Sequence, residues 1–130
     1  MKTKPLMTIS SLFLATIGIF ISFLPKEIAE YVNIEANNIT LLFLKILGAL
    51  YMGFGILNWM AKGTLIGGIY NRPIVFGNIM HFGVGAVALA KVMNSIQEYT
   101  AIIIALTIIY AIFALLFIYL FKINPTQIEK

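Results

Sequence analysis

The side chains that could do chemistry in this chain are few, and most of them fall inside apolar stretches. The only histidine, His81, lies in the segment GNIMHFGVG, three residues after Asn78. An ionisable side chain inside a membrane is a functional candidate by default, as a ligand or a proton-handling residue. The alternative is a neutral histidine that packs and hydrogen-bonds to a hydroxyl or carbonyl on a neighbouring helix. The sequence leaves both interpretations of His81 open.

The residue types that usually carry catalysis or metal binding are missing around this histidine. The chain has no cysteine, which excludes a disulfide framework, a thiolate metal site and a Cys nucleophile. A haem with two His ligands cannot form within one chain, and no Asp, Glu or Cys lies in an apolar run to complete a metal site. We therefore expect no catalytic residue and no metal, and the residues favour a protein that is not an enzyme.

The composition is typical of a membrane protein. Of the 130 residues, 61% are hydrophobic and 11% are charged, and the mean hydropathy is +0.98. A soluble domain carries about a quarter charged residues, so this chain cannot cover a globule with polar groups. The net charge of +4 does not indicate nucleic-acid binding, because the basic residues lie at the ends of apolar runs and form no dense patch.

Four apolar runs have the length of about 20 residues that a transmembrane helix needs. They cover residues 6–24, 40–61, 73–93 and 100–121. The first resembles a signal peptide because Lys2 and Lys4 precede it, but it is long for one and no A-x-A-like cleavage site follows, so we expect a retained helix. The sequence predicts an all-α fold: a single domain over residues 1–130, built as an antiparallel bundle of four transmembrane helices.

The distribution of Lys and Arg predicts the orientation. The outer side holds two, Lys26 and Lys91, whereas the inner side holds six: Lys2, Lys4, Lys62, Arg72, Lys122 and Lys130. We therefore expect both termini in the cytoplasm. In the first outer loop, apolar residues at positions 28, 31 and 32 predict a short interfacial helix. The inner loop 62–73 holds apolar residues that we expect against the membrane surface: Leu65, Ile66, Ile69 and Tyr70.

Small and polar residues mark the face of each helix that should meet other helices, because helices in lipid associate through close packing and polar contacts. In the first run these are Thr8, Ser11, Ala15, Gly18 and Ser22. In the second they are Lys45, Gly48, Tyr51, Met52, Gly55, Asn58, Trp59 and Lys62. In the third they are Gly77, Asn78, His81, Gly85 and Ala88. In the fourth they are Thr100, Thr107, Ala111 and Ala114, with Tyr110 beside them.

His81 falls about 12 Å into its helix from Pro73, close to the middle of the membrane. Tyr51 and Tyr110 fall at a similar depth, and each buried phenol needs a hydrogen-bond partner. His81 is a candidate for both, so a Tyr–His–Tyr cluster is a credible polar core, and it could equally line a small apolar pocket.

Among the remaining polar residues, Lys45 has two interpretations and the others have one. Lys45 either extends to the outer headgroups or faces a cavity and attracts an anionic group. Asn58 and Asn78 fall at similar depth, so a structural contact between them is possible. Trp59 is placed as an interfacial anchor.

The segments GFGILNWMAKG and GGIYNRPIVFGNIMHF, within residues 53–82, resemble a group of small four-span bacterial membrane proteins. The overall layout of the spans also resembles the DoxX-like bundles. This resemblance implies a bacterial inner-membrane location and a quinone or lipid partner. It supplies no catalytic signature that can be carried over to residues of this chain.

These observations predict an accessory or interaction subunit of the membrane, as a homo-oligomer or within a larger membrane complex. The alternative is a protein that binds a lipid, quinone or other small amphiphile in a pocket between the second and third spans. His81, Tyr51, Lys45 and Asn78 would line that pocket, and the further candidates for the site are Tyr110, Asn58 and Trp59. No cofactor other than such a guest is expected.

Overall fold

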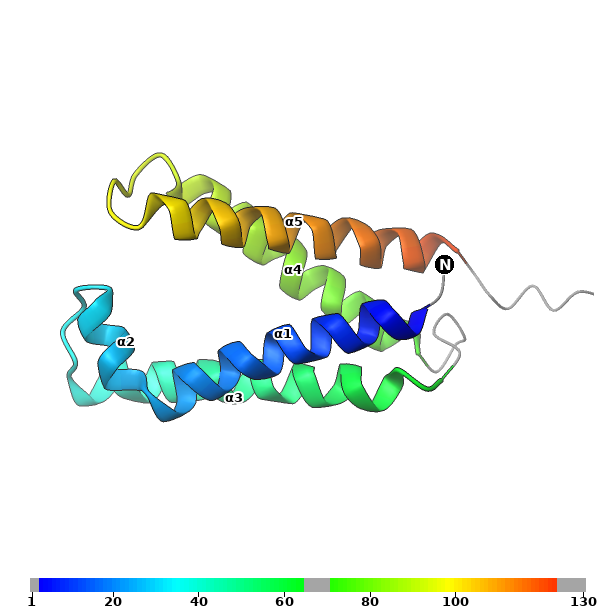
Figure 1. Ribbon diagram of the computed structural model, residues 1–130, viewed down its shortest axis with the longest axis horizontal. Helices are drawn as coiled ribbons and strands as arrows, with labels where there is room; N and C mark the ends of the chain where they lie inside the picture. The colour runs from blue at the N-terminus through cyan, green and yellow to red at the C-terminus, as the bar shows by residue number, and fades with distance from the viewer. Residues whose placement is uncertain (1–2, 65–70, 124–130) are drawn as a thin grey trace, which may run out of the picture. The chain divides into compact units, whose positions relative to one another are not determined.

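The computed structural model describes residues 3–64 and 71–123, and the described residues form helices joined by short loops (Figure 1). The helices are α1 (Thr3–Phe23), α2 (Pro25–Tyr31), α3 (Asn38–Ala61), α4 (Arg72–Val92) and α5 (Thr100–Lys122). The four longer helices are long and apolar enough to cross a membrane. The all-α fold and the four predicted spans are thus confirmed, and the chain is a multi-pass membrane protein. The inner-loop residues Leu65, Ile66, Ile69 and Tyr70 lie outside the described residues.

The helices fall into two compact units. The first unit covers residues 4–63 and holds α1, α2 and α3; the second unit contains α4 and α5. Within the first unit, α1 and α3 run antiparallel, because Ser11 meets Gly55 while Gly18 lies next to Gly48. Within the second unit, α4 and α5 run antiparallel as well. The prediction of a single domain stays a prediction.

The short helix predicted between the first two spans is confirmed as α2, and its position at the membrane interface stays a prediction. Proline at the start of α2 suits a helix's first turn, where its missing N–H is not needed. The helix closes at Asn33, which has a positive φ of 54°, and the Ile34 N–H donates to the Ala29 carbonyl at 2.9 Å. Asparagine tolerates this left-handed conformation better than most residues. The chain then enters α3 through Asn37, whose side chain accepts a hydrogen bond from the Thr40 N–H at 2.9 Å.

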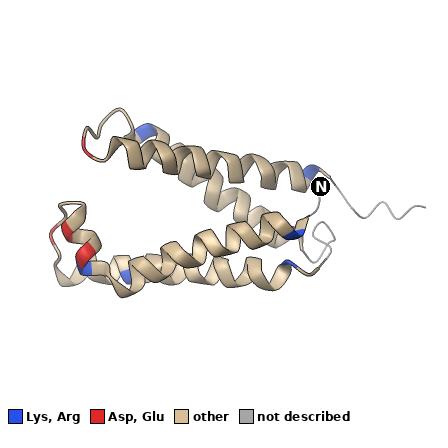
Figure 2. Cartoon of the chain, viewed as in Figure 1, with Lys and Arg blue, Asp and Glu red and all other residues tan. Residues whose placement is uncertain are grey.

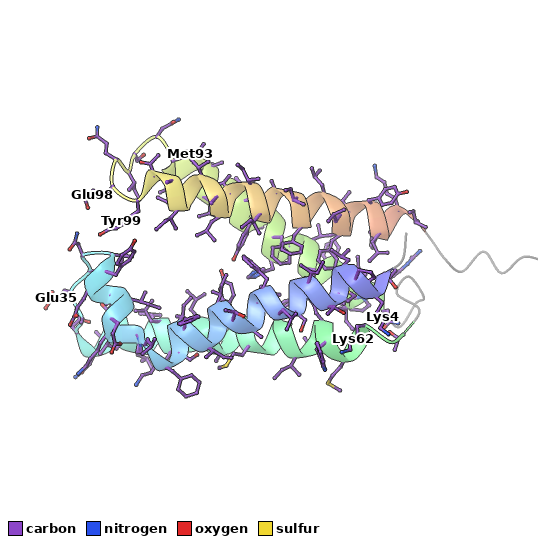
Figure 3. The ribbon with its side chains drawn as sticks, viewed as in Figure 1. Lys4, Glu35, Lys62, Met93, Glu98 and Tyr99 are labelled. Atoms are coloured by element: carbon purple, nitrogen blue, oxygen red, sulfur yellow. The ribbon has the colours of Figure 1, made fainter. Side chains whose placement is uncertain are left out.

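The two ends of the first unit differ in charge (Figure 2). Lys4, near the start of α1, and Lys62, directly after α3, lie at the same end (Figure 3). Glu35 lies at the opposite end, beside α2, which contributes two further acidic residues, Glu27 and Glu30. One end of the first unit therefore carries lysines, and at the other end three carboxylates lie together with Lys26 and Lys45.

The second unit turns between its helices through residues 93–99. Tyr99, the residue before α5, has a positive φ of 58°. This conformation is uncommon for a bulky residue. The start of α4 is more regular: Pro73 lies in its first turn, and the Asn71 side chain donates to the Thr64 hydroxyl at 3.1 Å.

Candidate functional site

The contact between α1 and α3 is a close approach of two backbones. A Cβ placed on Gly18 would lie 2.8 Å from the Gly48 carbonyl oxygen, and a Cβ on Gly48 would lie 2.8 Å from the Gly18 carbonyl oxygen. The Ser22 hydroxyl occupies space that a side chain at Gly48 would need. Carbon–oxygen distances below 3.0 Å cannot be accommodated without a shift, so glycine is required on both helices here. The predicted small-residue faces of the first and second spans are therefore in contact.

Polar side chains reinforce this contact further along the same pair. The Ser11 hydroxyl donates to the Gly55 carbonyl at 2.7 Å. The buried Asn58 amide donates to the Ser10 hydroxyl at 3.0 Å, and that hydroxyl donates to the Met7 carbonyl at 3.2 Å. Asn58, a predicted ligand-binding residue, thus has a structural task inside the first unit.

The other predicted site residues of α3 are not gathered in the α1 contact. Lys45 is exposed, Tyr51 is half-buried, and Trp59 is 46% exposed. The Lys62 ammonium lies 2.8 Å from the centre of the Trp59 ring, which is a cation–π contact. Trp59 therefore has a charged partner on its own helix end.

In the second unit, His81 and Tyr110 come together as predicted. The Tyr110 hydroxyl oxygen lies 3.4 Å from His81 Nε2, and the two ring centres are 5.6 Å apart. Which of the two groups donates depends on the tautomer of the histidine. The glycine one turn after His81 makes the pairing possible, because a Cβ on Gly85 would lie 2.5 Å from the Tyr110 ring. The ring lies in the space left by that missing side chain.

A column of aromatic rings continues from this pair and was not predicted. Phe82 is fully buried; its ring centre lies 5.2 Å from that of Tyr110, 4.7 Å from that of Phe113 and 5.9 Å from that of Phe117. The spacing of Tyr110, Phe113 and Phe117 places them on one face of α5, which is the signal that could have found them.

The small-residue face predicted for the fourth span is only partly buried. Tyr110 and Ala114 are buried, whereas Thr100, Thr107 and Ala111 are half-buried. The Thr107 hydroxyl donates to its own helix, to the Ile103 carbonyl at 2.7 Å. Aromatic packing replaces the expected close approach of small residues in this unit.

Asn78 lies on the same helix as His81, and its side chain is buried. Its amide donates to the Ile74 carbonyl, four residues earlier, at 2.8 Å. The structure thus brings together His81 and Tyr110, with Asn78 about one turn away on α4. That Tyr51, Lys45, Asn58 and Trp59 of the first unit share a site with them stays a prediction.

The His81–Tyr110 pair can donate and accept hydrogen bonds, which suits a carbonyl, a hydroxyl or a proton in transit. Comparisons with protein-family models, curated proteins and solved structures found no match to this chain. The resemblance to small four-span bacterial proteins and to DoxX-like bundles therefore stays a prediction.

Proposed function

We propose that this protein is an accessory or interaction subunit of a membrane assembly, either a homo-oligomer or a larger complex. The observation that carries the proposal is the use of polar side chains inside each unit. Ser11, Asn58 and Asn78 bond to their own unit, and His81 bonds to Tyr110. The bonds of Ser11, Asn58 and His81 join one helix to its neighbour, whereas the bond of Asn78 lies within α4. Joining helices is the task of a structural subunit.

The outward faces of the helices support the same proposal. Large apolar side chains are exposed along α3, for example Phe43, Leu50 and Leu57, and along α5, for example Ile112 and Leu115. Such faces offer little to orient a polar substrate, but they pack well against lipid and against other transmembrane helices.

We further propose that the protein lies in the bacterial inner membrane with both termini in the cytoplasm. The end of the first unit that carries Lys4 and Lys62 would then face the cytoplasm, and the carboxylate-rich end would face outward. Lys and Arg near the ends of spans favour the cytoplasmic side. Cysteines introduced at exposed Lys26 and Lys122 would test this: an impermeant thiol reagent on intact cells should label the first and not the second.

The mass of the solubilised protein tests whether the chain is part of an assembly. The chain weighs 14.5 kDa, so light scattering in a mild detergent should give a protein mass well above that value. Alanine substitution of Phe43, Leu50 and Leu57, compared with alanine at Ile112 and Leu115, would then identify the face involved. A strictly monomeric protein from native membranes would overturn the proposal.

A second candidate function is the binding of a quinone or another small amphiphile at His81. It is favoured by the Tyr110–His81 pair, a polar contact beside the ring column of Phe82, because such a setting suits a guest with one polar and one apolar part. Native mass spectrometry of the wild type and of His81→Phe should differ in the bound small molecules. Ile108→Phe, at an exposed position, is the control, and identical profiles for all three proteins would refute the site.

A further inference from the structure

The first unit carries an open groove on the α1–α3 pair that has no part in the proposed functions. It encloses about 280 Å³. Its floor is formed by the small residues at the helix contact, and Leu12, Ile56 and Trp59 form its sides. Pockets for drug-sized ligands enclose roughly 300–1,000 Å³, so this groove is slightly smaller and has room for part of one hydrocarbon chain.

A positive charge, the Lys62 ammonium, lies at one end of this groove. Trp59 is the groove residue closest to the end of α3, and the Lys62 ammonium lies over its ring. Lys62 follows Gly55, in the floor, by seven residues, which is about 10 Å along a helix. Lys4 lies at the same end of the unit and adds a second cation (Figure 3).

From this arrangement we propose that the groove binds one acyl chain of an anionic phospholipid, whose phosphate lies at Lys62. The apolar lining matches the hydrocarbon chain, and the lysine supplies three N–H donors to phosphate oxygens while its ring contact keeps it in place. A neighbouring transmembrane helix would match the apolar lining but would leave the cation without a counter-charge. Charge complementarity therefore selects the lipid.

The tryptophan makes the proposal measurable, because Trp59 is the only one in the chain. The protein is placed in vesicles of phosphatidylcholine with a minor share of phosphatidylglycerol. In one set the phosphatidylglycerol carries brominated acyl chains; in the other an equal amount of phosphatidylcholine carries them. Bromine quenches tryptophan emission at short range, and both sets have the same headgroup composition. The two sets thus differ only in which lipid reports contact with Trp59.

The brominated phosphatidylglycerol should quench Trp59 more strongly than the brominated phosphatidylcholine. One lysine near a bilayer surface favours an anionic lipid by about fivefold in binding constant. Lys62→Gln should remove most of this difference, and Lys4 accounts for what remains. Lys122→Gln, which removes a cation at the end of α5, is the matched control and should leave it unchanged.

A second pair of variants tests the groove itself. Ile56 lines it and Leu57 does not, and both side chains are exposed, so phenylalanine at either position should leave the fold intact. Ile56→Phe should reduce the excess quenching, and Leu57→Phe should not. The proposal is overturned if the two brominated lipids quench the wild type equally, or if both lysine variants act alike. It also fails if neither lipid reaches Trp59, as expected when a second copy of the chain fills the groove.

Discussion

The two units hold their helices together in opposite ways. In the first unit, α1 and α3 meet backbone to backbone at Gly18 and Gly48, and a serine hydroxyl bonds to the facing main chain at Gly55. In the second unit, α4 and α5 meet through a column of rings around Phe82. Within a membrane, lipid tails are as apolar as the side chains, so the removal of apolar surface from water stabilises neither contact. Close packing and polar bonds must stabilise both contacts, and the two units combine them differently.

The difference predicts different tolerance to substitution. A contact between backbones has no side chain that can rotate away, so any added atom must move a helix. A contact between rings can adapt by small rotations of the side chains, so the loss of stability grows gradually with the size of the change. Substitutions at matched positions in the two units can therefore test whether the two contacts differ in this way.

The largest effect is expected at Gly48 in the first unit. A valine there would collide with the Gly18 carbonyl and the Ser22 side chain, and should destabilise the unit by about 3 kcal/mol. Gly53→Val is the control, because a Cβ at Gly53 meets nothing within 4 Å. Reversible denaturation in detergent micelles measures both. Equal losses in the two variants would show that helix propensity, not the close approach, sets the cost.

The next effect is expected at the centre of the ring column. Phe82→Ala would leave a void among Tyr110, Phe113 and Phe117 and should cost about 2 kcal/mol in the same assay. The control is Phe76→Ala, since that side chain is 54% exposed, and its cost should be well below that. A larger loss of stability at position 76 than at position 82 would contradict the packing of Phe82 among the rings of α5.

A smaller effect is expected at Gly85, where a ring and not a backbone fills the space. Gly85→Ala should push the Tyr110 ring aside and cost about 1 kcal/mol. Gly83→Ala has open space and should stabilise the helix by up to about 1 kcal/mol. The comparison with Gly48 holds only if the loss at Gly85 is clearly smaller than the loss at Gly48.

The smallest effects concern single hydrogen bonds, which contribute about 0.6 kcal/mol on average between transmembrane helices. Ser11→Ala removes a bond of 2.7 Å in the first unit, and Tyr110→Phe removes one of 3.4 Å in the second. We expect the serine variant to lose more stability, about 0.6 kcal/mol against about 0.3 kcal/mol. A reversed order would mean that the His81–Tyr110 bond tightens in the membrane.

The sequence allowed the fold and part of the site to be predicted, for reasons that differ between the units. Glycine and serine in an apolar run usually mark a contact between helices, so the contact face with Ser11 and Gly18 could be predicted. The spacing of Tyr110, Phe113 and Phe117 could have indicated one face of α5. Phe82 has no such signal, because phenylalanine suits both lipid and a helix contact. The pairing of His81 with Tyr110 was predicted because a polar group in an apolar run demands a partner.

The Trp59–Lys62 contact could also have been found from the sequence. The two residues are three apart, which places them on the same face of a helix end. Neither the groove beside them nor its lining by Leu12 and Ile56 has a local signature, because it arises where two distant segments meet.

The mutual approach of Gly18 and Gly48 has a consequence for the register of the first unit. Each glycine carries only a hydrogen where a Cβ would lie 2.8 Å from the carbonyl oxygen of the other. In another register, a side chain of one helix would meet the backbone of the other at this point. The alignment of α1 on α3 is therefore set by the main chain itself, and the groove beside Trp59 inherits a fixed shape from it.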